Sequence, residues 1–489
     1  MQIPAYMQQM KNRIRQRWRG PGGVKEIMVI AVPLIMSTGA HGLRMFTDRA
    51  FLMWYDTNAI SGAMMAGMAA FTLISLFQGT IAYVSTFVAQ YTGAARHHRV
   101  GHAVWQGVFM AVLAGIIMLL FIIPARRFFQ LIGHNPDIQL FEVTYFRIMC
   151  IGAAPAMVSI ALSSFFTGRG KTKLVMCITL TSTALNIILD YALIFGKFGF
   201  PQMGVAGAGW ATVISAACGT LMFLYFFLRP EYREKYSTLK GARPDFRLFA
   251  RIIRFGLPNG IQFMLEMTCW TIFHALAGKI SDTAFNASAM TMQIHSLSFM
   301  PMIGCAIATS ILVGQRIGSG QPDIAERSAW SSVITASAYM FLLAIGYVTL
   351  PRLFMLPFSA GANAADFAAI APVSIVLLRF VAVHNLFGGT NMMLSSSLKG
   401  AGDTRYVMAV STSMVWLIVA VPSLIAVRFF NPQIYVLWIF TTTFAAVMCI
   451  ILLKRFLQGK WKSMKVIEAP APSIPLNAPN VPATEIETP

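Results

Sequence analysis

The stretch VAQYTGAARHHRVGHAVW, residues 88–105, has a counterpart in VGQRIGSGQPDIAERSAW, residues 313–330. The two blocks lie 225 residues apart, and several identities share that offset. Within the blocks, Val88, Gln90, Gly93 and Trp105 each recur as the same residue 225 positions later, and further upstream so do Pro33 and Gly79. An offset that is kept over so long a stretch indicates an internal duplication rather than chance similarity.

A second pair of blocks extends the duplication towards the C-terminus. SSFFTGRGKTKLVM, residues 163–176, corresponds to SSSLKGAGDTRYVM, residues 395–408, at an offset of 232 residues. The second half has therefore gained seven residues between the two blocks, and we expect them in the loop around 351–369.

The composition places both halves in a membrane. Only 11% of the 489 residues are charged and 56% are hydrophobic, with a mean hydropathy of +0.64, whereas soluble proteins have about 25% charged residues. Apolar stretches of about 20 residues, long enough to cross a bilayer, recur along the chain. Gly, Pro and charged residues separate them into twelve predicted transmembrane helices, at 26–54, 58–90, 102–124, 140–167, 174–196, 203–228, 252–280, 282–314, 328–350, 370–397, 406–428 and 434–453.

Six helices per repeat return the chain to the same side of the membrane, so the two repeats are parallel. The sequence therefore predicts an all-α membrane protein of two parallel six-helix lobes, related by a pseudo-two-fold axis along the membrane normal. Transporters often use such repeats. The predicted parts are a basic N-terminus (1–25), a first lobe (26–228), a linker (229–251), a second lobe (252–453) and a tail (454–489). The tail is basic at first and is expected to be disordered after Lys465, where Pro, Ala, Asn and Thr predominate and suggest no packed core.

The distribution of Lys and Arg orients the chain. Of 38 such residues, 28 lie in or beside the termini and the loops on their side, six lie on the opposite side, and four lie within helices. By the positive-inside rule, both termini are expected in the cytoplasm. This bias also accounts for most of the formal charge of +20, so nucleic acid is not an expected partner.

Two acids of the first half are predicted to lie at one depth. Asn186 and Asp190, in LNIILD (185–190), are four residues apart and share one helix face. Asp190 lies about six residues, or ~9 Å, from the outer end of its helix, and Asp48 lies equally far from the outer end of the first helix. Thr212 reaches a similar depth. Because an intramembrane charge persists only with a partner, water or a function, these four residues predict a cation-coupling site for H⁺ or Na⁺.

Asp48 also has a structural interpretation. Arg44 precedes it by one helical turn and Arg49 follows it directly. An Arg44–Asp48 ion pair would neutralise the carboxylate locally. We favour the coupling role, but the residues alone leave both interpretations open.

Glu266 is the candidate acid of the second half. It lies midway along the seventh predicted helix, with Gln262 one turn earlier and no Lys or Arg within a turn. Such an acid suits a proton carrier or an anchor for a cationic substrate, and Gln262 would assist it. The alternative is a neutral Glu that is hydrogen-bonded to a neighbouring helix. Asp282, beside Ser281, is expected to cap a helix.

Neither histidine nor cysteine indicates a resident metal. His97, His98 and His102 alternate with Arg96 and Arg99 in a predicted cytoplasmic loop, which we interpret as a solvated basic turn. The six cysteines all lie within apolar segments, without CxxC spacing, and are interpreted as packing residues. Apart from Na⁺ at Asp48, Asn186 and Asp190, no metal and no cofactor is expected.

Five motifs, occurring in order over about residues 26–455, resemble the multidrug and toxic compound extrusion (MATE) family. They are VAQYTGAARHH, LNIILD followed by PQMGVAGAGWAT (201–212), GLPNGIQFMLE (256–266), ILVGQRIGSG (311–320) and LKGAGDT (398–404). The resemblance implies export of organic, often cationic, compounds by antiport with H⁺ or Na⁺. It also implies that Asp48, Asn186, Asp190 and Thr212 match the family's first-lobe cation site and that Glu266 matches its helix 7 acid.

Two departures from the family pattern favour a first-lobe coupling site. Many members have an Asp in helix 10, where this chain reads HNLFGGTN (384–391), with Gly388 or Gly389 at about that position. Arg49 also stands where a small polar residue is more common.

The predicted function is therefore that of a multidrug efflux antiporter of the bacterial inner membrane, working by alternating access. The alternative within the superfamily is a lipid-linked oligosaccharide flippase, whose pyrophosphate substrate would need several basic groups. Only Arg44, Arg49, Arg147 and Arg379 fall within predicted helices. No HExxH, GxSxG or comparable motif indicates an enzyme. The expected partners are small organic substrates and membrane lipid, and the chain is expected to be a monomer.

Overall fold

The computed structural model of the chain describes residues 18–133, 135–359 and 364–468. Residues 1–17 of the predicted basic N-terminus and residues 469–489 of the predicted disordered tail lie outside the described residues. Within the described ranges the chain forms helices and connecting turns, with no strand.

The helices of the first half are α2 (Val24–Tyr55), α3 (Thr57–Ala82), α4 (Val84–Gly93), α5 (His97–Leu120), α6 (Ala125–Ile132), α7 (Pro136–Gly168), α8 (Thr172–Phe195) and α9 (Val205–Phe227). A short linker helix, α10 (Pro230–Arg233), follows. The second half comprises α11 (Phe246–Ile280), α12 (Asp282–Gly318), α13 (Pro322–Thr349), α14 (Pro351–Ser359), α15 (Ala364–Ala401), α16 (Thr404–Val415), the π-helix η1 (Trp416–Ala420), α17 (Val421–Phe429), α18 (Ile434–Leu457) and the 3₁₀-helix η2 (Lys460–Ser463).

All twelve predicted transmembrane helices are present. Eleven spans in the described residues are long and apolar enough to cross a membrane. The twelfth is α11, which is 35 residues long but carries the polar residues Asn259, Gln262 and Glu266 in its interior. The prediction of an all-helical membrane fold is thus confirmed.

The structure differs from the prediction at several helix ends. The second predicted helix is interrupted by a turn at Tyr83, and the short helices α6 and α14 occupy predicted loops. Helix α11 begins at Phe246, inside the predicted linker. The cap of α12 is Ser281, whose Oγ accepts a hydrogen bond from the Ala284 amide at 3.1 Å, so the prediction that Asp282 is the cap was wrong.

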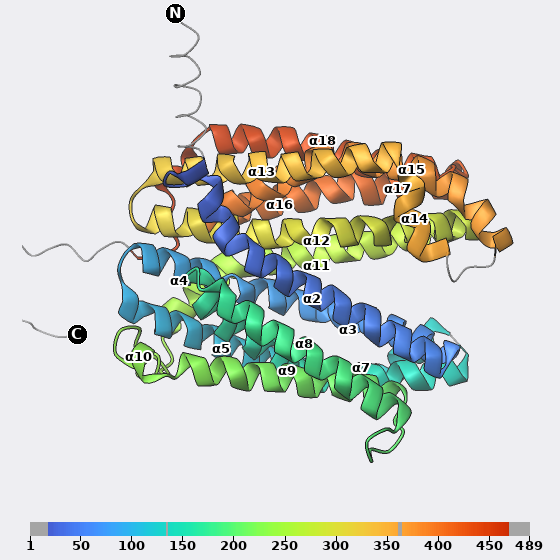
Figure 1. The fold of residues 1–489 in the computed structure, drawn as a ribbon, viewed down its shortest axis with the longest axis horizontal. Coiled ribbons are helices and arrows are strands. Elements are labelled where there is room, and N and C mark those ends of the chain that lie inside the picture. The colour runs from blue at the N-terminus through green and yellow to red at the C-terminus, as the bar shows by residue number, and fades with distance from the viewer. Residues whose placement is uncertain (1–17, 134, 360–363, 469–489) are drawn as a thin grey trace, which may run out of the picture.

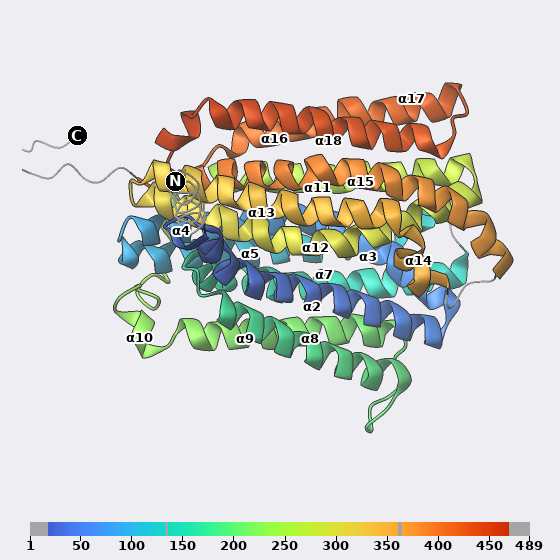
Figure 2. The ribbon, with the colours of Figure 1, turned by 45° about the horizontal axis from the view of Figure 1, so that its top comes forward.

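The long helices run side by side along one axis, with the first half (blue to green) on one side and the second half (yellow to red) on the other (Figures 1 and 2). We call the end where α2 begins and α18 finishes the tail end, which is on the left in Figure 1. The opposite end, where α2 finishes and α14 lies, is the far end.

Among the described residues, the halves share buried apolar clusters through residues near the tail end. Two buried clusters mix residues of both halves. The residues that cross into the other half's core are Ile27, Ile30, Ala31, Leu34 and Ala89 from the first half, and Leu248, Ile252, Val466 and Ile467 from the second. Towards the far end, one further cluster lies within each half. The halves are therefore joined at the tail end and have separate cores at the far end.

Duplicated glycines let the backbones of the two halves meet at the tail end. A side chain on Gly93 would collide with the backbone of Gln315, and one on Gly318 would collide with the backbone of Gln90. These contacts are related by the 225-residue offset, since Gly93 corresponds to Gly318 and Gln90 to Gln315. The duplication therefore places a glycine at the same position in each half, and each glycine allows close backbone contact with the other half.

The chain after α18 returns to this contact. The Val466 and Ile467 side chains are only 1% and 7% exposed and belong to the apolar core of the first half. The prediction that the tail is disordered beyond Lys465 was wrong for Val466–Glu468. Composition suggested no core there, but these residues enter a core built by other helices.

Gly260→Ala should destabilise the protein, although Ala normally stabilises a helix interior by about 1 kcal/mol relative to Gly. A Cβ at Gly260 would meet the Leu76 carbonyl of α3, across the boundary between the halves, and such overpacking costs about 1–3 kcal/mol. The control is Gly39→Ala on α2, where a Cβ would meet nothing within 4 Å. Thermal unfolding in detergent measures both, and equal stability of the two variants would contradict this packing.

Candidate functional site

Helix α8 lies beside α2 in a register that brings two acids to one level. Two contacts fix this register. The Thr172 hydroxyl donates to the Ile30 carbonyl, 142 positions earlier, at 3.1 Å. The Tyr191 ring lies 6.0 Å from the Phe51 ring, 140 positions earlier. Asp48 and Asp190 are also 142 positions apart. The structure therefore places Asp48 of α2 level with Asp190 of α8, near the far end.

Helix α9 runs antiparallel to α8 and brings a hydroxyl to the same level. Its register follows from the close approach of Gly207 to Leu193 and from the hydrogen bond between the Ser182 hydroxyl and the Ser215 carbonyl at 2.8 Å. Counting from these two contacts places Thr212 level with residues 185–188, beside Asn186. All four residues predicted for the coupling site thus lie at one depth, on three adjacent helices.

The polar atoms of this cluster lack protein partners. Asn186 and Asp190 are fully buried. Within the described part of the chain, six buried atoms of the cluster have no hydrogen-bond partner, namely Asp48 Oδ1, Asn186 Oδ1 and Nδ2, Asp190 Oδ1 and Oδ2, and Thr212 Oγ1. Buried polar groups are nearly always hydrogen-bonded because an unmet one costs about 1–3 kcal/mol. Convergent oxygens of this kind fit a small cation or a proton.

The surroundings of Asp48 bear on its alternative role. The Arg44 guanidinium lies 2.8 Å from the His41 ring nitrogen, and among the described residues no ion pair joins it to Asp48. Arg44 still acts electrostatically on both Asp48 and Asp190, which are close enough to interact with each other. This arrangement favours a shared carboxylate site over a local Arg44–Asp48 pair.

Tyr145 is a member of this site that the sequence did not reveal. It lies on α7, and its hydroxyl is within electrostatic range of both Asp48 and Asp190. Tyr145 is more than 40 residues from each of the other members, so helical spacing could not link it to them.

Glu266 and Gln262 lie apart from this cluster, on the wall of a cavity of about 280 Å³ in the second half. Gln262 Nε2 donates to Glu266 Oε1 at 2.7 Å. Lys399, from the end of α15, lines the same cavity. Glu266 is therefore isolated from basic residues along its own helix but not in space, because α15 brings Lys399 to the cavity.

Two histidines form a further polar group beside this cavity. The rings of His295 on α12 and His384 on α15 are 5.6 Å apart and nearly perpendicular. His384 lines the cavity, and its Nδ1 lies 3.3 Å from the Thr441 carbonyl. The two histidines are 89 positions apart in the sequence, so their spacing did not link them. The described residues contain no cluster of three or more His, Cys, Asp or Glu that could hold a metal ion.

The duplication does not extend to the candidate site. At the 225-residue offset, Asp48 corresponds to Phe273, which is buried and packs on Trp438 at 5.8 Å between ring centres. Glu266 corresponds in turn to His41. At the 232-residue offset, the segment around Asn186 corresponds to the π-helix η1. Each half therefore has its own polar chemistry on a shared backbone plan.

Comparison with known proteins supports one family. A family model described as MatE matches residues 33–192 and 258–425, which together make up about two thirds of the chain. Each matched segment covers most of one half, as expected for a duplicated chain.

Two similar curated proteins carry the same name. "Probable multidrug resistance protein NorM" of Brucella suis biovar 1 (strain 1330) is 28% identical over 399 residues, covering 80% of this chain and 84% of the relative. The protein of that name from Thermotoga maritima is 25% identical over 449 residues, covering 91% and 94%.

Solved structures share the fold. An outward-facing multidrug resistance MATE family transporter of the MOP superfamily aligns with a TM-score of 0.81 at 18% identity, covering 91% of this chain and 98% of that one. A MOP superfamily transporter from Pyrococcus furiosus Vc1 aligns with a TM-score of 0.80 at 19% identity, covering 92% and 97%. At these identities the likeness supports the two-lobe fold alone.

Asn186→Ala should leave the free energy of unfolding unchanged or raise it by up to about 1 kcal/mol, because it removes an unpartnered buried amide and introduces a better helix former. Asn259→Ala on α11 is the matched control. The Asn259 amide donates to the Gly79 carbonyl at 2.7 Å, so its loss should cost about 1–2 kcal/mol. Thermal unfolding compares the two, and an equal loss in both would assign Asn186 a structural role.

Proposed function

We propose a function from the premise that this chain belongs to the MatE family of membrane transporters. We propose that it is a secondary antiporter of the bacterial inner membrane that exports small organic, often cationic, compounds in exchange for H⁺ or Na⁺. The relatives named multidrug resistance proteins support the substrate class. The observation that carries the coupling role is the group of unpartnered buried oxygens of Asp48, Asn186, Asp190 and Thr212.

The coupling chemistry follows from like charge in a poor solvent. Two ionised carboxylates at one depth in the membrane, Asp48 and Asp190, repel each other and lack water to screen them. A proton on one of them, or a Na⁺ shared with the oxygens of Asn186 and Thr212, removes that repulsion. Binding of the coupling ion therefore changes the energy of bringing α2 and α8 together at the far end.

Helix α2 is the element that transmits this change. Its later part carries Asp48, and its first turns place Ile27, Ile30 and Leu34 in the apolar core of the second half. A shift of α2 on ion binding would thus act on the contact between the halves. The Lys and Arg bias predicts cytoplasmic termini, which would make the joined tail end the cytoplasmic side. We propose that this arrangement corresponds to the outward-facing state of an alternating-access cycle.

The cavity of the second half is proposed to hold the substrate. Glu266, with Gln262 hydrogen-bonded to it, supplies an anionic anchor, and Trp270 and Phe299 supply aromatic surface on the same wall. A flippase for a pyrophosphate-linked lipid would need several cations there. Lys399 is the only Lys or Arg among the described residues that line the cavity, and Arg147 and Arg379 are exposed on their helices.

Asp190→Asn should abolish ion-driven export while leaving the protein folded, because an amide keeps the shape but cannot carry the charge. The measurement is movement of a fluorescent organic cation in proteoliposomes, with a proton or a sodium gradient imposed separately. Asp282→Asn, at an exposed first-turn acid of α12, is the control and should behave as the wild type. Wild-type transport by Asp190→Asn would remove the coupling site. No transport under either gradient would favour the flippase, to be tested with a lipid-linked sugar.

Glu266→Gln should impair cationic substrates more than neutral ones, since only the former lose an ionic contact. A loss of roughly tenfold or more in transport of the cation, equivalent to about 1.4 kcal/mol, is expected. Transport of a cationic and a neutral dye by the same proteoliposomes measures it, with Glu231→Gln on the exposed linker helix as control. An equal loss for both dyes would indicate a structural role for Glu266.

A further inference from the structure

The two halves hold each other at the tail end through a symmetric pair of amides. Gln90 Nε2 donates to the carbonyls of Gly400 at 3.0 Å and Ala401 at 3.2 Å. Gln315 Nε2 donates to the Gly168 carbonyl at 2.8 Å. Gln90 corresponds to Gln315 and Gly168 to Gly400 in the duplication. Each half therefore offers the same donor to the same turn of the other half.

The ionic contact beside these amides is not symmetric. On one side, Glu26 of α2 pairs with Arg316 of α12 at 2.6 Å. At the 225-residue offset, Glu26 corresponds to Arg251 and Arg316 corresponds to Tyr91. The equivalent positions therefore carry the guanidinium of Arg251 and the phenol of Tyr91, and neither of them provides a carboxylate.

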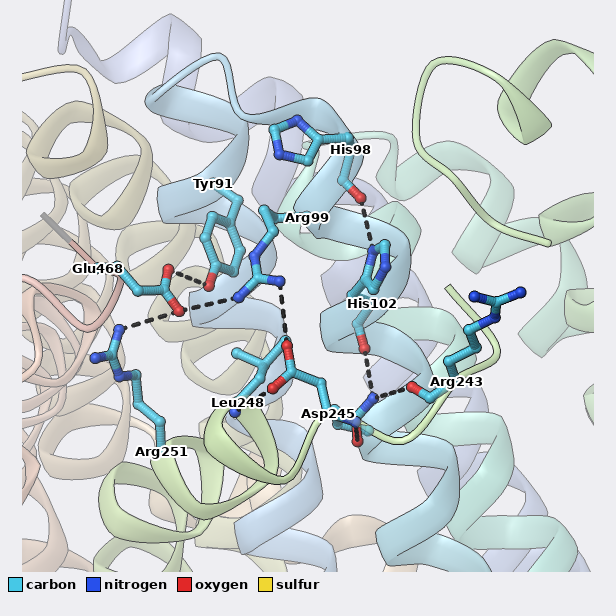
Figure 3. Close-up of polar contacts among 10 residues, drawn as sticks. Tyr91, His98, Arg99, His102, Arg243, Asp245, Leu248, Arg251 and Glu468 are labelled. Carbon is cyan, nitrogen blue, oxygen red and sulfur yellow. Dashed lines mark hydrogen bonds and ion pairs between the residues drawn. The ribbon is translucent and has the colours of Figure 1, made fainter. Parts of the chain in front are cut away.

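Glu468 supplies that carboxylate (Figure 3). Its Oε2 accepts a hydrogen bond from the Tyr91 hydroxyl at 2.7 Å, and its Oε1 lies 3.1 Å from Arg251 Nη1 and 3.3 Å from Arg99 Nη2. Tyr91 and Arg99 belong to the first half and Arg251 to the second. A residue beyond the last transmembrane helix therefore bridges the two halves.

The backbone around Glu468 is held as well. The Val466 amide donates to Gln90 Oε1 at 2.9 Å, so one glutamine side chain binds the other half and the tail together. Arg96 Nη1 donates to the Glu468 carbonyl at 2.8 Å. With the buried side chains of Val466 and Ile467, these contacts make a shaped site rather than a surface charge pair.

The linker between the halves meets the same site. Arg99 Nη1 pairs with Asp245 at 3.1 Å, and Asp245 caps α11 by accepting from the Leu248 amide at 3.0 Å (Figure 3). Burial alone would raise the pKa of the Glu468 carboxyl, but the Tyr91 hydroxyl and the Arg251 and Arg99 guanidinium groups outweigh it and hold this pKa below its usual value. Arg96 and Arg99 are thus bound to carboxylate and carbonyl groups, and the prediction of a solvated turn was wrong for them.

We propose that Val466–Glu468 is an intramolecular strap, which docks in a site shared by the two halves and holds the tail end closed. The tail end can open only when the strap leaves Tyr91, Arg99 and Arg251. This regulatory role rests on the alternating opening of the two ends proposed above. The docking itself depends on neither the substrate nor the coupling ion.

The test is hydrogen–deuterium exchange of the full chain in lipid nanodiscs, compared between wild type, Glu468→Gln and Ile467→Asp. The first variant removes the charge of the strap and the second expels its apolar anchor. Amides at the tail-end termini of α4 (84–93) and α12 (311–318) should exchange roughly tenfold faster in both, which corresponds to about 1.4 kcal/mol. Glu234→Gln, an exposed linker acid, is the matched control and should exchange as the wild type.

The amides at the far-end start of α9, where Val205 and Ala208 belong to a separate apolar cluster, report on the fold. A rise in the exchange rate that is confined to the amides of α4 and α12 supports the proposed strap. Wild-type exchange at α4 and α12 in both variants would overturn it, and so would a rise that extends to α9, because the tail would then support the whole fold. Exchange needs no transport, so this result stands whether or not Asp190→Asn abolishes export.

Discussion

The structure depends on one constraint, that a bilayer offers no water to a backbone amide or carbonyl. The chain meets it by making helices throughout its apolar segments, which satisfy the backbone internally. Lipid chains are as apolar as the helices, so the hydrophobic effect does not drive helices together within the membrane. Close backbone contact at small residues stabilises their association instead. Gly93, Gly260 and Gly318 permit that contact between the halves. The buried side-chain oxygens of Asp190 also lack a hydrogen-bond partner, and this is the reason that we propose a function for them.

The sequence was sufficient to predict the position of a residue where the relevant residues share a helix or a repeat. The four-residue spacing of Asn186 and Asp190, and equal distances from the helix ends, predicted a cluster that the register of α2, α8 and α9 reproduces. Their role in coupling stays a prediction. Sequence was insufficient where packing joins distant helices, as for Tyr145 beside Asp48 and Lys399 beside Glu266. It was wrong for Val466–Glu468, because a polar, Pro-rich context says nothing about a core that other helices provide.

Duplication gave this chain two copies of one scaffold, and the copies have since separated in chemistry. The glycine contacts and the Gln90 and Gln315 amides remain paired across the pseudo-two-fold axis. Asp48 faces Asp190 in the first half, whereas its counterpart Phe273 is part of an apolar core. Symmetry is thus kept where the halves contact each other, and it is lost at the candidate site.

The position of Glu468 along the chain also sets the order in which the molecule is made. The ribosome synthesises this residue after every transmembrane helix, so the carboxylate between Tyr91 and Arg251 is among the last interhelical contacts to form. The two halves can meet during insertion through their shared apolar cores, their glycines and their glutamines, before Glu468 is present. Glu468 would then join a contact that the two halves have already begun to form.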